Sequence, residues 1–193
     1  WSFYYAQCVL NHINEDELIC FLRTEDMGGA YIKTYLHDKN IIKYDEKTIH
    51  TWPLEPYQYL GGIIKKRKWD KSNIGVEMDS HYFTAFCYEK IKTGLPNAKI
   101  KDAERLVNWV RVVKSDSEIQ LMKSAARITE KGMKTAFESI NPDVRQCDAI
   151  AAIQKTLFSG TPEFGGDYPS IATLLPTGKG TSASHLTATE DKF

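Results

Sequence analysis

Short apolar runs alternate with amphipathic stretches through residues 3–101, and this alternation constrains the fold more than any other feature of the chain. Runs rich in β-branched and aromatic residues predict strands at residues 3–10, 18–23, 40–44, 73–78 and 99–101. Apolar residues at helical spacing predict helices at residues 27–34, 57–68 and about 80–92. The first two strands should form a hairpin, and Asp79 or Ser80 should cap the third helix. Strands that alternate with helices are typical of an α/β domain whose sheet is at least partly parallel.

A capping box predicts the start of a long helix in the second half of the chain. Ser115 precedes Glu118 by three residues, so the side chain of each can accept a hydrogen bond from the backbone amide of the other. This helix should end before Pro142, and a second helix over residues 146–158 should end at Gly160. The positions predicted to be buried are Ile119, Met122, Ala126, Thr129 and Met133 in the first helix, and Cys147, Ile150, Ile153 and Leu157 in the second.

A shorter helix is expected after Asp102, which can cap it. One face of this helix carries Leu106, Trp109, Val110 and Val113. We place the domain boundary directly after it, which gives one domain over residues 1–113 and a second over residues 114–193.

Two turns and a histidine characterise the last part of the chain. Gly165 and Gly166 form the first turn, since glycine tolerates a positive φ. Residues 168–175 then predict a strand, residues 177–180 a second turn, and residues 182–187 a return strand. The predicted hairpin would present the imidazole of His185.

The other four histidines lie in polar or turn-like contexts that indicate solvated surface positions: His12, His37, His50 and His81. His185 differs because the small residues that precede it would allow a ligand to approach. An imidazole whose pKa is near 6.5 can exchange protons at neutral pH, which makes His185 a candidate acid or base. The alternative is a hydrogen-bonded histidine with a structural role.

Several kinds of site are not supported by the sequence. The Gly165-Gly166 pair lacks the further glycine and the Lys-Ser/Thr of a phosphate-binding loop. Glu163 and Asp167 have no further ligands at the spacing of a metal site, and a Ser-His-Asp order is absent because only Glu190 and Asp191 follow His185. The cysteines are too far apart for a zinc knuckle or a Cys-x-x-Cys motif, and they fit a reducing cytoplasm.

The charge balance argues against a nucleic-acid-binding protein, because Lys+Arg and Asp+Glu both number 25. The only basic run, residues 65–68, indicates a solvated helix end, with phosphate binding as the alternative. Apolar runs of about 18 residues, which could span a membrane, are absent, and a signal peptide is not visible. The chain begins with Trp1 inside a strand-like run, so we expect it to be a fragment that is cut at both ends.

Residues 106–115, Glu118-Ile119 and residues 125–128 together resemble the domain junction of the creatinase, prolidase and aminopeptidase P superfamily. The resemblance extends over essentially the whole chain. It implies a creatinase-like α/β amino-terminal domain, with a mixed sheet and flanking helices, followed by the first part of an α+β pita-bread catalytic domain. Residues 1–4, 74–80, 145–149, 165–169 and 184–187 are similar to a branch of the superfamily that hydrolyses a small cyclic amidine.

By this resemblance, His185 corresponds to the first active-site histidine of the pita-bread fold. Trp1, Asp167 and Tyr168 are expected to contact a small-molecule substrate. Metal-dependent relatives hold a divalent metal with two Asp, one His and two Glu, which would lie beyond residue 193, whereas creatinase-like relatives use no metal. The need for a metal therefore stays open. The resemblance also implies a homodimer in which the amino-terminal domain of one subunit borders the active site of the other.

Three functions follow from the resemblance. The first is hydrolysis of a non-peptide C–N bond in a cyclic amidine, the second is metal-dependent cleavage of Xaa-Pro peptides, and the third is protein binding without catalysis. The histidine at position 185 favours an enzyme. We expect the 193-residue chain to be inactive alone, because most of the catalytic domain would be missing.

Overall fold

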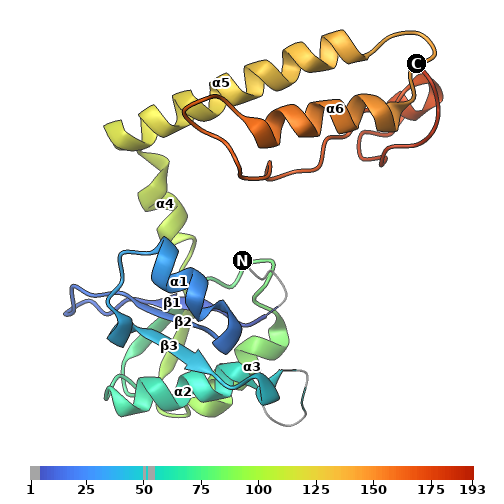
Figure 1. Cartoon of the computed structure of the whole chain (residues 1–193). Helices are drawn as coiled ribbons and strands as arrows, with labels where there is room; N and C mark the ends of the chain where they lie inside the picture. Colours follow the sequence, from blue (N-terminus) through green and yellow to red (C-terminus); the bar gives the residue numbers. More distant parts are fainter. Residues whose placement is uncertain (1–4, 50, 52–54) are drawn as a thin grey trace. The chain divides into compact units, whose positions relative to one another are not determined.

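The computed structural model describes residues 5–49, 51 and 55–193. Two compact units divide the chain, Trp1–Arg111 and Val112–Phe193, here called unit 1 and unit 2 (Figure 1). Unit 1 contains all the named strands, and unit 2 consists of two long helices and an irregular segment. Within the described ranges, none of the helices combines the length and the apolar character needed to cross a membrane.

The strands of unit 1 form a mixed arrangement. β1 (Cys8–Leu10) pairs antiparallel with β2 (Ile19–Arg23), and β2 pairs parallel with β3 (Ile41–Tyr44). β4 (Asn73–Val76) and β5 (Lys99–Asp102) form a parallel pair. The predicted hairpin and the α/β class are thereby confirmed. The first strand begins later than predicted, and residues 3 and 4 of its predicted range lie outside the described residues.

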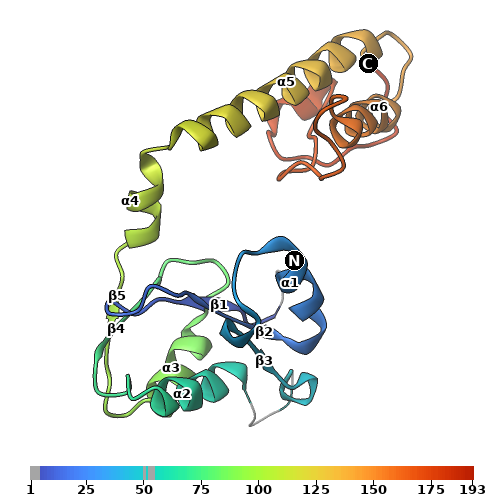
Figure 2. The same ribbon diagram turned by 60° about the vertical axis from the view of Figure 1, so that its left-hand side comes forward.

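Helices of unit 1 cover both faces of the three-stranded sheet β1-β2-β3, with α1 on one side and α2 and α3 on the other (Figures 1 and 2). Their bounds are Met27–Lys33 for α1, Pro56–Lys66 for α2, Ala85–Gly94 for α3 and Leu106–Val112 for α4. Three short 3-10 turns, at Thr24–Asp26, Asp38–Asn40 and Glu46–Thr48, connect the strands and helices.

The cap predicted for α3 is wrong. The helix begins after Thr84, whose hydroxyl oxygen accepts a hydrogen bond of 3.3 Å from the amide of Cys87. Asp79 forms an ion pair with Arg105 instead, across the loops that follow β4 and β5. Asp79 is engaged in that pair, and Ser80 belongs to a turn in which its carbonyl accepts from the Phe83 amide at 3.0 Å, so Thr84 supplies the cap.

Two apolar clusters on opposite faces of the strands form the core of unit 1. The larger cluster packs Phe21 and Tyr44 of the sheet against Leu60 and Ile64 of α2 and Ile91 of α3. The smaller cluster joins Leu22, Ala30 and Ile41 beneath α1. Neighbouring residues of β2 and β3 therefore enter different clusters, as the alternating side chains of a strand require. Because both faces of β2 and β3 are buried, continuous apolar runs in the sequence predicted these strands correctly.

Glu17 connects the loop before β2 to the residues before β3. Its carboxylate accepts hydrogen bonds from Asn40 Nδ2 at 2.8 Å and forms an ion pair with Lys39 Nζ at 2.9 Å. The bond from Asn40, and then that from Lys39, holds the pKa of Glu17 below its ordinary value of 4.5. The ionised carboxylate is therefore the form that the folded structure favours.

We expect this stabilising contribution to be complete above about pH 4.5 and to be lost as the pH falls through the lower pKa of the folded state. Wild type should have a higher midpoint of thermal unfolding than Glu17→Gln at about pH 7, and the difference should shrink towards about pH 3. Asp38→Asn, a change at an exposed carboxylate nearby, is the control. A constant difference between wild type and Glu17→Gln at all pH values would contradict the expectation.

Unit 2 is built on an antiparallel pair of helices, α5 (Asp116–Ser139) and α6 (Gln146–Ser159). The capping box is confirmed, since the Ser115 amide donates to Glu118 Oε2 at 2.7 Å and the Glu118 amide donates to Ser115 Oγ at 3.3 Å. The helices approach closely at Gly132, where an added Cβ would lie 2.6 Å from Leu157 Cδ2. Small residues at the contact therefore allow the two helices to pack.

The buried stripe predicted for α5 is wrong. Ile119, Met122 and Met133 are 36%, 53% and 52% exposed, and Ala126 and Thr129 are also exposed. The face that packs against α6 carries Ser124 and Gly132 instead. Apolar periodicity identifies a face of α5 that is suited to burial. The close contact with α6 instead buries the face of α5 that carries the smaller residues. The apolar face predicted for α4 is likewise exposed at Leu106, Trp109, Val110 and Val113.

The hairpin predicted at the end of the chain is also wrong. Residues 168–175 are irregular, a 3-10 helix, η4 (Gly178–Ser182), stands where the second turn was expected, and residues 183–187 of the predicted return strand are irregular as well. The hydroxyl groups of Thr181 and Ser182 donate to the carbonyls of Gly178 and Lys179, both at 2.8 Å. These local bonds offer the backbone an alternative to strand pairing, which is a known tendency of serine and threonine. Pro169, in turn, lacks an amide for the first strand.

Candidate active-site segment

Of the candidate site residues, Trp1 lies outside the described residues. Asp167, Tyr168 and His185 all belong to the irregular segment of unit 2 that follows α6. This segment contains the predicted turn and the candidate histidine. Its geometry decides which side chains it presents to solvent and which it uses to hold itself in place.

A compact loop after α6 confirms the turn predicted at Gly165 and Gly166. The Thr161 amide donates to the Phe164 carbonyl at 2.7 Å, and the Gly166 amide donates to the Phe158 carbonyl at 2.8 Å. Gly166 has a φ of 88°, and a Cβ on Gly165 would lie 2.5 Å from the Ser159 carbonyl oxygen. The two glycines therefore serve the turn in different ways, one by its positive φ and the other by a close backbone approach.

Asp167 and Tyr168 leave this loop as exposed residues. Asp167 Oδ1 accepts a hydrogen bond from the Tyr168 amide at 2.9 Å, and the Tyr168 side chain is 54% exposed. One carboxylate oxygen of Asp167 thus fixes the local turn, while the phenol ring is available to a ligand. In the described part of unit 2, neither side chain forms a hydrogen bond or ion pair with His185.

Glu163 has surroundings that sequence reasoning missed. Its own backbone amide and then the Thr161 hydroxyl donate to its carboxylate, and with Arg127 and Lys131 nearby they hold the pKa of Glu163 below its ordinary value. Lys131 Nζ also donates to the Gly160 carbonyl at 2.9 Å. The loop is therefore hydrogen-bonded to Lys131 of α5, and Arg127, four residues earlier on the same face, lies near the Glu163 carboxylate.

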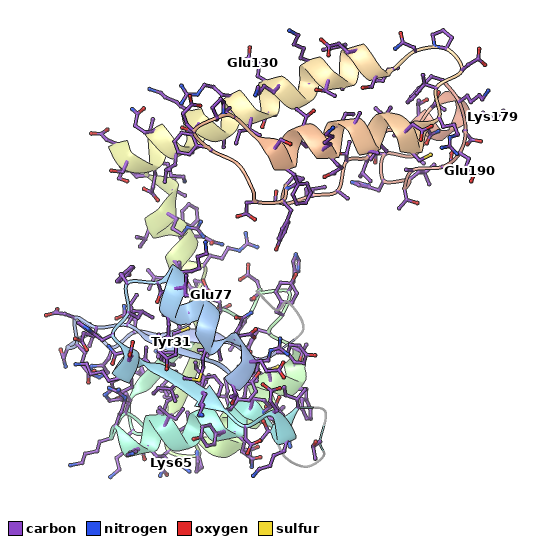
Figure 3. All side chains as sticks on the ribbon, in the orientation of Figure 1. Tyr31, Lys65, Glu77, Glu130, Lys179 and Glu190 are labelled. Carbon is purple, nitrogen blue, oxygen red and sulfur yellow. The ribbon has the colours of Figure 1, made fainter. Side chains whose placement is uncertain are left out.

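His185 lies in an irregular stretch directly after η4 and is exposed. Its Nδ1 is 3.1 Å from Ser184 Oγ. Figure 3 labels Lys179, in η4, and Glu190, a few residues after His185, at the same end of unit 2. After the histidine the chain folds back towards η4. Leu186 shows this, since its Cδ1 would lie 3.6 Å from a Cβ added to Gly180 of η4.

Two glutamines of α6 anchor the segment that carries His185. Gln154 Nε2 donates to Thr173 Oγ1 at 2.8 Å, before the histidine, and the Thr189 amide donates to the buried Gln146 Oε1 at 3.3 Å, after it. The glutamines are eight residues apart, roughly 12 Å along the helix. Their inward position among apolar residues of α6 was the signal that could have identified them.

The last residues of the chain pair with the start of α6. The amides of Gln146 and Cys147 donate to the carbonyls of Asp191 and Thr189 at 2.9 and 3.2 Å, and the Phe193 amide donates to the Val144 carbonyl at 3.1 Å. Since Arg145, the N-cap residue, makes no side-chain cap, this backbone pairing supplies acceptors for the first amides of the helix. It also fixes the chain a few residues after His185.

A metal centre is not formed by the residues that the structure describes. Among them, no three His, Cys, Asp or Glu side chains come together in a way that could hold a metal ion. The described part of the segment thus offers one exposed imidazole, one exposed phenol and several exposed carboxylates, among them that of Asp167. An imidazole can transfer protons, a phenol can pack against a cation, and a carboxylate can accept from N–H groups.

Comparisons with known proteins give a family for the chain. Residues 3–113 match the family of the creatinase/prolidase N-terminal domain. The chain is 36% identical to the ectoine hydrolase of Halomonas elongata over 199 aligned positions, which cover 100% of this chain and 50% of that protein. It is 39% identical to an uncharacterized hydrolase/peptidase of Sinorhizobium fredii over 166 positions, which cover 86% and 42% of the two chains.

Solved structures support the same fold. Prolidase from Pyrococcus furiosus aligns with a TM-score of 0.66 at 17% identity, over 91% of this chain and 48% of that one. Prolidase from Thermococcus sibiricus aligns with a TM-score of 0.68 at 15% identity, over 92% and 44%. The chain spans about half the length of the curated relatives that it matches.

Proposed function

Because the chain belongs to the creatinase/prolidase family, we propose that the whole protein carrying it is a hydrolase that opens the cyclic amidine of ectoine. The observation that carries this proposal is the 36% identity to ectoine hydrolase over the entire chain. The match to the Xaa-Pro dipeptidase of Pyrococcus furiosus is weaker, at 22% identity over 186 positions. The stretches at residues 165–169 and 184–187, which suggest the amidine-hydrolysing branch, belong to the segment that carries His185.

The proposed reaction needs a proton donor near neutral pH. Water adds to the amidine carbon of ectoine, one C–N bond of that carbon then breaks, and the departing nitrogen takes up a proton. A positioned imidazole suits this last transfer, and such general acid–base catalysis contributes about 10²–10⁴ in rate. We assign the role to His185, or else the task of stabilising the tetrahedral centre that develops at the amidine carbon.

The substrate contacts are proposed from the chemistry of ectoine, a small ring that carries an amidinium and a carboxylate. The exposed Asp167 has an oxygen that can accept from the amidinium N–H groups, and Tyr168 can offer its ring face to the positive charge. Trp1, in the amino-terminal domain of the partner subunit of a homodimer, is proposed to offer its aromatic ring to the same positive charge. All three contacts rest on the family resemblance.

The remaining proposals concern the whole protein. Residues 1–113 are proposed as the amino-terminal domain and residues 114–193 as the first part of the catalytic domain, working in the cytoplasm. If a divalent metal is used, its carboxylate and imidazole ligands are proposed to come from the part of the relatives' length that this chain does not span. A metal would supply an activated water for the attack on the amidine carbon.

Xaa-Pro peptide hydrolysis is the second candidate. It is favoured by the match to the Xaa-Pro dipeptidase of Pyrococcus furiosus, and the solved structures with similar folds include prolidases from Pyrococcus furiosus and Thermococcus sibiricus. Their sequence identities of 17% and 15% support the shared fold alone. Hydrolysis of ectoine therefore remains the first candidate, and the two differ in the bond that is cleaved.

Turnover of ectoine by the whole protein, followed by NMR, tests the proposal. We expect ring opening to be observed, and a parallel sample with a chelator to show whether a metal takes part. Activity that survives chelation would favour a metal-free reaction, and activity lost on chelation and restored by a divalent metal would favour a metal-assisted one. Absence of ring opening in both samples, together with cleavage of an Xaa-Pro dipeptide, would replace ectoine by the second candidate.

A further inference from the structure

The β3 strand is an edge of its sheet. In the described part of unit 1 it pairs with β2 on one side, and the strand order β1-β2-β3 ends with it. An edge strand directs half of its backbone N–H and C=O groups away from its neighbour, where they can pair with another chain. Figure 1 shows β3 as the outer strand, next to α2.

Two hollows of about 390 and 800 Å³ lie beside β3, the smaller at its carboxyl end, where Thr24 and Thr48 also line it, and the larger between β3 and α2. Tyr59 of α2, which is 52% exposed, lines both of them. Ile42 of β3 and Ile63 of α2 contribute apolar surface to the larger hollow. Gly62 deepens it, since a Cβ at that position would meet no atom within 4 Å. We call this region the β3–α2 groove.

The β3–α2 groove is cationic although the chain as a whole has no net charge. Among the described residues that line it, Lys39, Lys43, Lys47, Lys66 and Arg67 are basic and Asp45 alone is acidic. Three of the basic residues have carboxylate partners at the surface, with N–O distances of 2.9 to 3.3 Å. Such exposed pairs contribute only about 0–1 kcal/mol each, so a ligand can replace them.

Two basic residues of the groove are available without breaking a pair. In the described part of unit 1, neither Lys43 nor Lys66 has an ion-pair partner. Lys66 also belongs to the basic run at residues 65–68, which the proposed hydrolase activity does not use. The edge strand, the apolar floor and the surrounding cations therefore form a single surface.

We propose that the β3–α2 groove binds an extended, acidic segment of a partner protein, which adds to β3 as a further strand. Alternate residues of such a segment would face α2 and pack against Tyr59 and Ile63, while acidic side chains would meet the basic residues around them. Backbone pairing with an edge supplies affinity, and the side-chain contacts supply specificity. The positive lining selects a negatively charged partner.

Charge also argues against a second copy of this chain in the groove. If two β3 edges were paired, Lys43 of each would approach the basic residues of the other, and like charges on facing strands are destabilising. Lysines on edge strands are a common means of preventing self-pairing. The same lysines do not oppose an acidic strand, which explains why the proposed occupant is a different protein.

The test is binding of a labelled peptide to the whole protein, measured by fluorescence polarisation. The peptide alternates glutamate and valine over about eight residues, enough to pass the whole of β3. A second peptide keeps the charges but has proline at every other valine position, so it cannot pair as a strand. Tripolyphosphate serves as a probe for simple anion binding. We expect the first peptide to bind, and the proline peptide to bind at least about tenfold more weakly.

Two neighbouring lysines provide matched variants. Lys66 lines the groove together with Ile63. Lys65, labelled in Figure 3, lies two residues after Ile63, so its side chain leaves α2 at roughly 200° from that of Ile63 and away from the groove. Lys66→Glu should weaken peptide binding at least about tenfold, and Lys65→Glu should change it less than about twofold. Gly62→Leu should also weaken binding by filling the hollow, without lowering the thermal midpoint, because leucine favours a helix more than glycine does.

The other results would overturn the proposal. Equal losses in Lys65→Glu and Lys66→Glu would indicate general attraction to positive charge. Equal binding of the two peptides, or tripolyphosphate competing as well as the first peptide, would indicate an anion site without strand pairing. Concentration-dependent self-association that Lys66→Glu abolishes would make a second copy the occupant. None of these readouts depends on hydrolase activity.

Discussion

Replacing His185 with alanine in the whole protein is expected to lower the turnover of ectoine at least about a hundredfold, since general acid–base catalysis contributes about 10²–10⁴ in rate. The side chain is exposed, and its hydrogen bond is with its neighbour Ser184. Its removal should therefore take away the proton transfer and leave the fold intact. The measurement is the initial rate of ring opening at saturating ectoine, followed by NMR.

Stability and a second histidine provide the controls for His185→Ala. Surface substitutions that break no special feature change the free energy of unfolding by about 0.5 kcal/mol or less, so the midpoint of thermal unfolding should stay close to that of wild type. His81→Ala, at another exposed histidine, should retain full turnover. Near-normal turnover in His185→Ala would remove the catalytic assignment, and an equal loss in both variants would show that the effect is not specific to position 185.

A pH profile separates a proton-transfer role from a purely structural one. If His185 donates the proton, the limb of the pH–rate profile that it causes should be absent from the residual activity of His185→Ala. A variant with a displaced loop would retain the shape of the wild-type profile at a lower rate. Ser184→Ala, which removes the hydroxyl 3.1 Å from Nδ1, should lower the rate far less than loss of the imidazole.

The parts of the fold that the sequence predicted well depend on local chemistry. The capping box at Ser115 and Glu118 requires only residues three positions apart, and both of its bonds are present. The strands near residues 19–23 and 41–44 each contain residues buried on both faces, so a continuous apolar run was sufficient to identify them. In these cases the sequence pattern and the structural feature that it predicts are contained in the same few neighbouring residues.

The parts that were missed depend on residues far apart in the chain. The face of α5 that is buried was selected by its contact with α6 at Gly132 and Leu157, which periodicity within one helix does not contain. The irregular segment around His185 is held by Gln146 and Gln154, two polar residues in a helix whose main sequence signal is its apolar stripe. The type of a candidate site residue could therefore be predicted, but not the supports that position it.

Gly160→Ala is expected to cause the largest loss of stability in unit 2, roughly 3 kcal/mol. Gly160 ends α6 with φ 64° and ψ −139°, a backbone conformation that residues with a Cβ rarely adopt. A Cβ there would also lie 2.1 Å from the Phe164 carbonyl oxygen. That carbonyl accepts the bond from the Thr161 amide, so the loop has no soft side chain that could move to accommodate the methyl group.

A second glycine of the same loop separates the cost of backbone strain from the cost of the steric clash with the Phe164 carbonyl. Gly166 also has a positive φ, 88°, but a Cβ on it would meet no atom within 4 Å. Gly166→Ala should therefore show the cost of backbone strain alone, about 1 kcal/mol. Urea unfolding of the whole protein would measure both losses, and hydrogen exchange of the Thr161 and Gly166 amides would show whether the loop itself opens.

The position of this loop links the stability prediction to the site. Asp167 and Tyr168 follow directly after Gly166, and Lys131 holds the Gly160 carbonyl at 2.9 Å. If Gly160→Ala opens the loop, the KM for ectoine should rise because two proposed substrate contacts are displaced, while the contribution of His185 to kcat should be retained because Gln146 and Gln154 hold its segment separately. Equal unfolding free energies for Gly160→Ala and Gly166→Ala would show that the close approach to Phe164 does not constrain the loop.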